Sequence, residues 1–169
     1  MTAADTGTSI PPRRRWPEPV PHTADGRLLT EVVVATFRLN GRLLEAARHL
    51  AAEGGITAAW WQVLGGILDE PRTVSEIGRR MGLTRQAVQR IADLLVDRGL
   101  AEYRPNPSHR RASLLACTEA GYWAIRRVAL AQHPWANRVG AEVGADGLRG
   151  ALETMLRLIA ALDTEDALA

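Results

Sequence analysis

Residues 73–99 read TVSEIGRRMGLTRQAVQRIADLLVDRG, and this stretch decides the fold. It opens with TVSE, a capping box in which Thr73 caps a helix and the Glu76 side chain bonds back to the cap. The helix that follows is short, over about 74–81, because Gly82 is a residue that commonly ends helices. The stretch therefore begins with a short helix whose two ends are both specified locally.

A second capped helix follows after a short turn. Thr84 is its expected N-cap, the helix covers about 85–98, and Gly99 closes it. Two capped helices joined in this way predict a helix-turn-helix unit. The apolar positions expected to hold the unit on its core are Ile77, Met81, Leu83, Val88, Ile91, Leu94 and Leu95.

The residues after Gly99 change in character. We expect a short strand over about 100–104, turn chemistry in the sequence PNPS at 105–108, and a second strand over about 112–117. Arg110 and Arg111 lie where the hairpin loop returns to strand. A helix-turn-helix followed by a basic hairpin predicts a winged helix-turn-helix, a mainly α (α+β) fold with a two-stranded β-wing.

Helices are expected on both sides of this unit. A long helix over about 26–52 carries two apolar stripes, which suggests packing on two sides, one of them another subunit. A helix over about 58–69, broken by Pro71, contains Trp60 and Trp61. Another should start after Thr118 and run to about His133, where Pro134 interrupts. A last helix over about 145–162 repeats apolar residues at a 4-3-4-3, coiled-coil-like spacing, namely Leu148, Leu152, Met155, Ile159 and Leu162.

These elements predict four regions. Residues 1–24, rich in proline and arginine, form a flexible arm, which is either a disordered tail or a segment that contacts DNA or a partner subunit. Residues 25–56 form an N-terminal dimerisation helix, 57–117 the winged helix-turn-helix DNA-binding domain, and 118–169 the C-terminal dimerisation helices.

Positive charge gathers in one quarter of the chain. All 21 basic residues are arginine, and the formal net charge is only +2. Residues 71–111 nevertheless hold nine arginines and four acids, a net +5. Such clustering is typical of a surface that meets phosphate.

The helix over 84–98 is the expected reader of the DNA major groove. Its first turns present Thr84, Arg85, Gln86, Gln89 and Arg90. Arginine can bond guanine bidentately and glutamine can bond adenine, while a threonine hydroxyl at a helix N-terminus suits a phosphate. Arg110 and Arg111 would lie at the minor groove or its flanking phosphates. The alternative is that these residues form a solvated helix face.

The sequence contains no motif that indicates another class of function. No Ser-His-Asp set, paired carboxylate, phosphate loop or metal spacing among the four histidines occurs, so we expect no enzyme, no metal and no cofactor. Cys117 is the only cysteine and is interpreted as core filler rather than a redox sensor. No apolar run is long enough to span a membrane, so a cytoplasmic, nucleoid-associated protein is expected.

Residues 56–121 resemble the MarR (multiple antibiotic resistance regulator) family. The resemblance is carried by ITAAWWQVLGGILDEPRTVSEIGRRMGLTRQAVQRIADLLVDRGLAEYRP and then NPSHRRASLLACTEAG. It implies a homodimer with interlocking terminal helices, a palindromic double-stranded DNA operator, and often repression that a small phenolic or anionic effector relieves. Arg38, His49, Trp60 and Trp61 are the candidate effector pocket, with one tryptophan expected in the core.

The wing departs from the family pattern. Asn106 and His109 stand where the family usually has aspartates, the second of which normally braces the arginine that corresponds here to Arg111. Neutral His109 could accept a hydrogen bond from Arg111, whereas protonated His109 would repel it, which would weaken DNA binding below about pH 6.5. The rival hypothesis is a winged-helix dimer that has lost DNA binding and serves as a protein-interaction or small-molecule-binding module.

Overall fold

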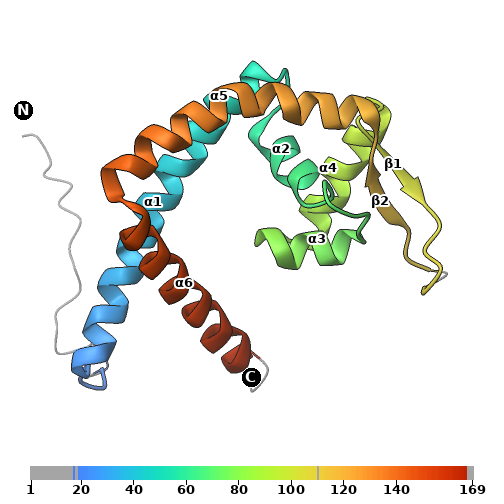
Figure 1. The fold of residues 1–169 in the computed structure, drawn as a ribbon. Helices are drawn as coiled ribbons and strands as arrows, with labels where there is room; N and C mark the ends of the chain where they lie inside the picture. The colour runs from blue at the N-terminus through green and yellow to red at the C-terminus, as the bar shows by residue number, and fades with distance from the viewer. Residues whose placement is uncertain (1–16, 18, 110, 167–169) are drawn as a thin grey trace, which may run out of the picture. The chain divides into compact units, whose positions relative to one another are not determined.

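The computed structural model describes residue 17 and the ranges 19–109 and 111–166. Almost all of the expected N-terminal arm lies outside these residues. The chain divides into two units, one ending at Gly41 and the other starting at Arg42, and each is described by itself. The elements are α1 (Ala24–Glu53), α2 (Ala58–Gly65), α3 (Val74–Met81), α4 (Arg85–Asp97), β1 (Ala101–Arg104), β2 (Leu114–Cys117), α5 (Glu119–Val143) and α6 (Ala145–Asp166) (Figure 1).

The expected caps form, because each depends on residues close together in sequence. Thr73 Oγ1 accepts from the Glu76 backbone N–H at 3.3 Å, and the Glu76 carboxylate accepts from the Thr73 N–H at 2.8 Å. The Thr73 hydroxyl also donates to the Glu76 carboxylate at 2.7 Å, and this bond, followed by the one from the Thr73 N–H, lowers the pKa of Glu76. Thr84 caps α4 by accepting from the Ala87 N–H at 3.2 Å, and Gly82 between the two helices adopts a left-handed φ of 64°.

The helix-turn-helix packs on one apolar core. α2 contacts α3, α4 and α5, and the residues with no exposed surface include Leu64, Ile77, Val88, Leu95 and Leu115. Met81, Leu83 and Ile91 pack on this core half-buried, as the sequence predicts. Leu94 does not, since 44% of it is exposed; it lies on the opposite side of α4 from the buried residues.

The wing is an antiparallel pair in which Ala101 lies opposite Cys117 and Arg104 opposite Leu114. A bridge that the sequence did not indicate joins it to the chain before α3: the Arg72 N–H donates to the Leu115 carbonyl at 3.1 Å, and the Leu115 N–H to the Arg72 carbonyl at 2.8 Å. The wing is thereby fixed to the helix-turn-helix. The prediction of a mainly helical winged helix-turn-helix with a two-stranded sheet is confirmed.

Two predicted helix ends are wrong. α2 ends at Gly65 rather than near Asp69, because two consecutive glycines favour leaving the helix there. α5 continues through Pro134 to Val143. An interior proline removes one helix hydrogen bond and costs about 3 kcal/mol, but Ala131 and Trp135 on either side of it pack against the core. Tertiary burial therefore overrides the local penalty.

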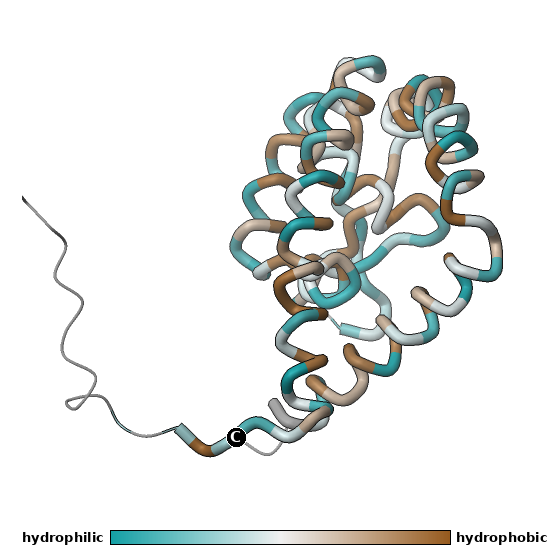
Figure 2. The backbone as a smooth tube through the Cα atoms, turned by 90° about the vertical axis from the view of Figure 1, so that its left-hand side faces the viewer, coloured by the Kyte–Doolittle hydropathy of each residue, from teal (hydrophilic) through white to brown (hydrophobic). Residues whose placement is uncertain are grey.

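The apolar residues predicted to face a partner are exposed in the single chain. In α1, Phe37 and Leu44 are examples; in α6, Leu148, Leu152, Met155, Ile159 and Leu162 are between 42% and 62% exposed. Hydrophobic and hydrophilic residues alternate along the helices (Figure 2), and within the described part of the chain no helix could cross a bilayer.

Candidate nucleic-acid interface

The N-terminal turns of α4 present a polar surface. Thr84, Arg85, Gln86 and Arg90 are exposed, whereas Gln89 is half-buried. Thr84 uses its oxygen to accept the capping bond, which leaves its hydroxyl proton for an outside acceptor. The Val88 and Ala92 side chains are buried and hold the helix on the core. Gln86 and Arg90 lie on the opposite side of α4, whereas Arg85 is exposed at its N-terminal end.

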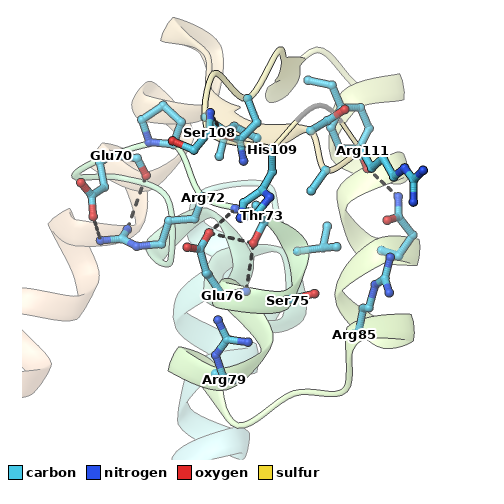
Figure 3. A pocket seen from close by; sticks show the side chains of 18 of the residues that line it. Glu70, Arg72, Thr73, Ser75, Glu76, Arg79, Arg85, Ser108, His109 and Arg111 are labelled. Atoms are coloured by element: carbon cyan, nitrogen blue, oxygen red, sulfur yellow. Dashed lines mark hydrogen bonds and ion pairs between the residues drawn. The ribbon is translucent and has the colours of Figure 1, made fainter.

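A groove of about 1100 Å³ lies between α3, the start of α4 and the wing. Its lining includes Arg79, Arg85 and Arg111, which come from three different elements (Figure 3). No acidic side chain lies within ion-pair distance of these three among the residues that the structure describes. Arg110, predicted beside Arg111, falls outside the described residues.

Several arginines of the basic stretch are already engaged. Only 11% of the Arg72 side chain is exposed. Its guanidinium pairs with Glu70 at 2.7 Å (Figure 3) and with Asp69 at 2.6 Å, and it donates to the Gly66 carbonyl at 2.6 Å. These bonds from Arg72 hold the pKa of Asp69 well below its usual range. Arg72 is therefore a structural residue, and two acids directly before residue 71 offset part of the +5 found in the sequence.

Three further arginines have partners. Arg104 pairs with Glu102 at 2.6 Å, and the Arg98 guanidinium lies 5.5 Å from the centre of the Trp60 ring, a cation–π contact. Arg80 lies 3.7 Å from Asp69. Among the nine arginines of residues 71–111, the described ones left without an ion-pair or cation–π partner are Arg79, Arg85, Arg90 and Arg111.

Gln89 is part of a hydrogen-bonded cluster that joins α4 to the wing. Its side-chain nitrogen donates to Asp93 Oδ1 at 2.9 Å and to the Tyr103 hydroxyl at 2.8 Å, and that hydroxyl donates to Asp93 Oδ1 at 2.7 Å. Burial, and then the hydrogen bond to Asp93, raise the pKa of Tyr103 to about 12. Sequence reasoning missed Tyr103 and Asp93; the i, i+4 spacing of Gln89 and Asp93 was the available signal.

The predicted brace in the wing is not formed. The loop is held by the Asn106 side chain, which accepts from the Ser108 N–H at 2.9 Å, and by the His109 N–H, which donates to the Asn106 carbonyl at 3.3 Å. Among the described hydrogen bonds, none joins the His109 imidazole to Arg111. The contact through which protonation of His109 was expected to act on Arg111 is therefore not formed.

The four residues of the predicted effector pocket are not brought together in either described cavity. Both tryptophans pack against the core, which corrects the expectation that only one does. Arg38 and His49 are exposed, and Arg38 belongs to the first unit. Burial raises the pKa of the Cys117 thiol, which disfavours the reactive thiolate. No cluster of potential metal ligands occurs within the described residues.

Comparison with known proteins agrees with this geometry. The MarR family model matches residues 54–112. Uncharacterised proteins of Mycobacterium bovis and Mycobacterium tuberculosis are 37% identical over 137 residues, which covers 81% of this chain and 96% of theirs. The residues matched by the family model contain the helix-turn-helix and β1, and β2 of the wing follows directly after them.

Solved structures share the fold. The transcriptional repressor CouR, bound to a 23-mer DNA duplex, is 29% identical with a TM-score of 0.62 over 83% of this chain and 99% of that one. CouR from Rhodococcus jostii bound to p-coumaroyl-CoA is 20% identical, with a TM-score of 0.68 over 76% of this chain and 91% of that one. The capped helix pair, the wing and these similarities together place the chain in the MarR family of transcription regulators.

Proposed function

We propose that the protein is a sequence-specific, double-stranded DNA-binding regulator that acts as a homodimer on a palindromic operator, most simply as a repressor. The observation that carries the proposal is the set of unpaired arginines, Arg79, Arg85, Arg90 and Arg111, around the start of α4 and the wing. CouR, the similar repressor bound to a DNA duplex, supports it.

The division of labour follows from the elements. Residues 57–117 bind DNA, with the helix from Thr84 in the major groove and Arg111, together with Arg110, at the minor groove. Residues 25–56 and 118–169 form the dimer, because their exposed apolar side chains need a partner to cover them. A two-fold dimer then sets two recognition helices about one DNA turn apart.

A salt titration tests the function. Four unpaired arginines in each of two chains predict a slope of log affinity against log salt of about −7, because each phosphate contact releases counterions. The affinity of the full-length protein for a mixture of random duplex DNA is measured between about 50 and about 300 mM salt, a range over which counterion release changes affinity strongly. Absence of DNA binding at every salt concentration would favour the rival module that binds only protein or small molecules.

Single arginine substitutions should distinguish contacts in the major groove from contacts in the minor groove. Arg85→Ala is expected to cost about 1–3 kcal/mol of operator affinity and to relax base preference at one position. Arg111→Ala should weaken binding to all sequences more evenly, since shape and phosphate contacts carry little base information. Competition binding against single-base operator variants measures both effects.

Arg98→Ala is the matched control for those variants. Its guanidinium lies over Trp60 at the far end of α4, so operator affinity should change by less than about 0.5 kcal/mol. If Arg98→Ala weakens binding as strongly as Arg85→Ala, the assigned DNA surface is wrong.

We also propose that a small phenolic or anionic effector relieves DNA binding. The similar protein CouR is bound to p-coumaroyl-CoA, an aromatic and anionic ligand, which supports this class. His49, Trp60 and Trp61, which all belong to the second unit, are the residues proposed to sense it. Quenching of tryptophan fluorescence by aromatic acids, together with release of labelled operator, tests the assignment. Quenching that His49→Ala leaves unchanged would count against it.

A further inference from the structure

The orientation of the Gln89 amide is fixed by its neighbours. Asp93 Oδ1 and the Tyr103 hydroxyl both lie within hydrogen-bond distance of the Gln89 side-chain nitrogen, at 2.9 and 2.8 Å. A carboxylate can only accept hydrogen bonds. If the amide turned over, its carbonyl oxygen would take the place of the nitrogen 2.9 Å from a carboxylate oxygen, which is repulsive.

The hydrogen bonds of the Tyr103 hydroxyl require the same orientation of the Gln89 amide. It donates its proton to Asp93 at 2.7 Å, so its oxygen is left to accept from Gln89. Because burial and Asp93 raise the pKa of Tyr103 to about 12, the hydroxyl keeps that proton across the working range of pH. Both partners therefore require a donor, and the amino group of Gln89 is held against Asp93 and the wing.

This orientation limits what Gln89 can read. The usual glutamine contact to adenine is bidentate: the amide carbonyl accepts from N6–H while the amide N–H donates to N7. With its amino group held by Asp93 and Tyr103, Gln89 retains its carbonyl oxygen for the DNA. Resting on the proposed function, we propose that Gln89 is a specificity-determining residue that reads one base as an acceptor only, selecting the exocyclic amino group of adenine or cytosine in the major groove.

The position of Gln89 fits this role. It lies one turn into α4 after Arg85, and it lines the groove that Arg85 and Arg111 also line. Asp93 and Tyr103 act through Gln89 and are positioning residues. Tyr103 comes from β1, so the wing itself sets the chemistry that the recognition helix offers to DNA.

The test uses the full-length protein and an operator selected from random duplex DNA. The base pair read by Gln89 is the one whose preference disappears in Gln89→Ala. We expect that removing the major-groove amino group of that base pair, which is on its adenine or its cytosine, abolishes the preference. Where adenine is preferred, replacing it with 7-deazaadenine, which lacks N7 and keeps the amino group, should change affinity less than twofold, because the proposal uses no N7 contact.

A control in the same duplex keeps the result interpretable. At the guanine whose preference depends on Arg85, 7-deazaguanine should weaken binding by about tenfold, since arginine uses N7. The double variant Asp93→Ala with Tyr103→Phe removes both acceptors from the Gln89 amino group. In this variant, 7-deazaadenine at the Gln89 position should weaken binding by about tenfold relative to adenine, because the amide is then able to make the bidentate contact.

Three outcomes overturn the proposal while leaving DNA binding intact. They are an unchanged wild-type affinity when the exocyclic amino group of adenine or cytosine is removed at the Gln89-dependent base pair, a tenfold loss of wild-type affinity with 7-deazaadenine, and no change of base preference in Gln89→Ala. If 7-deazaadenine does not change the affinity of the double variant, Asp93 and Tyr103 are not positioning residues for Gln89. Failure to select any operator instead contradicts the proposed function itself.

Discussion

Replacing Gly121 with alanine is expected to destabilise the protein by about 3 kcal/mol or more, the upper range for overpacking a core. Gly121 lies in the first turn of α5, beneath the junction between α4 and β1. A Cβ there would lie well inside van der Waals contact of the Leu100 carbonyl oxygen and 2.9 Å from Cys117 Sγ. Both the glycine and its obstacle are backbone, so neither can move aside by changing rotamer.

The surrounding hydrogen bonds prevent relief of this clash. The Leu100 carbonyl accepts from the Thr118 N–H at 3.2 Å, and the Thr118 hydroxyl donates to the Gly99 carbonyl at 2.7 Å while accepting from the Gly121 N–H. Moving α5 away from Leu100 would break these bonds at the start of the helix. Gly121→Ala should consequently disturb the wing as well as stability.

Urea unfolding followed by circular dichroism, at one fixed protein concentration, measures the effect. Gly65→Ala is the matched control, because a Cβ at Gly65 would meet nothing within 4 Å and alanine is the better helix former. That variant should be neutral or more stable by up to about 1 kcal/mol. If the free energy of unfolding of Gly121→Ala is within about 1 kcal/mol of the wild-type value, as for a typical substitution, the close approach of Leu100 to α5 is wrong.

The parts of the fold that the sequence predicts well are those determined by neighbouring residues. Thr73 and Glu76 satisfy each other's backbone within a single turn, and Thr84 and Thr118 cap α4 and α5 in the same local way. Such bonds depend little on the rest of the molecule. The start of α3, α4 and α5 could therefore be placed before any packing was known.

The misplaced features depend on contacts between distant residues. Pro134 reads as a break, yet the burial of Trp135 and Ala131 keeps α5 continuous across it. Arg72 counts toward the net positive charge of residues 71–111 in the sequence, but its backbone bridge to Leu115, which holds it in the structure, depends on where β2 lies. Local pattern gives no access to such pairings.

The same division runs through the candidate site. The exposure of Gln86 and Arg90 follows from helical periodicity, because Val88 and Ala92 lie on the buried side of α4. The restraint on Gln89 does not, because it needs Tyr103, fourteen residues away, to be brought to α4 by the hairpin. The exposed face of α4 could therefore be predicted from its sequence, whereas the hydrogen bonds that orient Gln89 depend on the fold.

Introducing a charge into the apolar seam of α6 is expected to abolish the proposed dimer and to lower operator affinity by about 100-fold or more. Leu152 is 58% exposed in the single chain and lies near the middle of the Leu148 to Leu162 repeat. In a two-stranded pairing, Leu152→Glu would bury two carboxylates against apolar side chains, which is strongly unfavourable. A monomer then binds one half-site at a time and loses the gain from linking two sites.

Thr154→Glu is the matched control, since it adds the same charge on the side of α6 that faces away from the seam. Sedimentation measures the oligomeric state, and binding to a whole operator and to a half-site measures the two affinities. We expect Leu152→Glu to lose the higher affinity for the whole operator and Thr154→Glu to keep it. Because Leu152 lies outside the buried core, the winged helix-turn-helix should remain folded, and half-site binding should persist. A Leu152→Glu protein that stays dimeric with unchanged operator affinity would place the subunit interface elsewhere, and the apolar repeat of α6 would then need another partner.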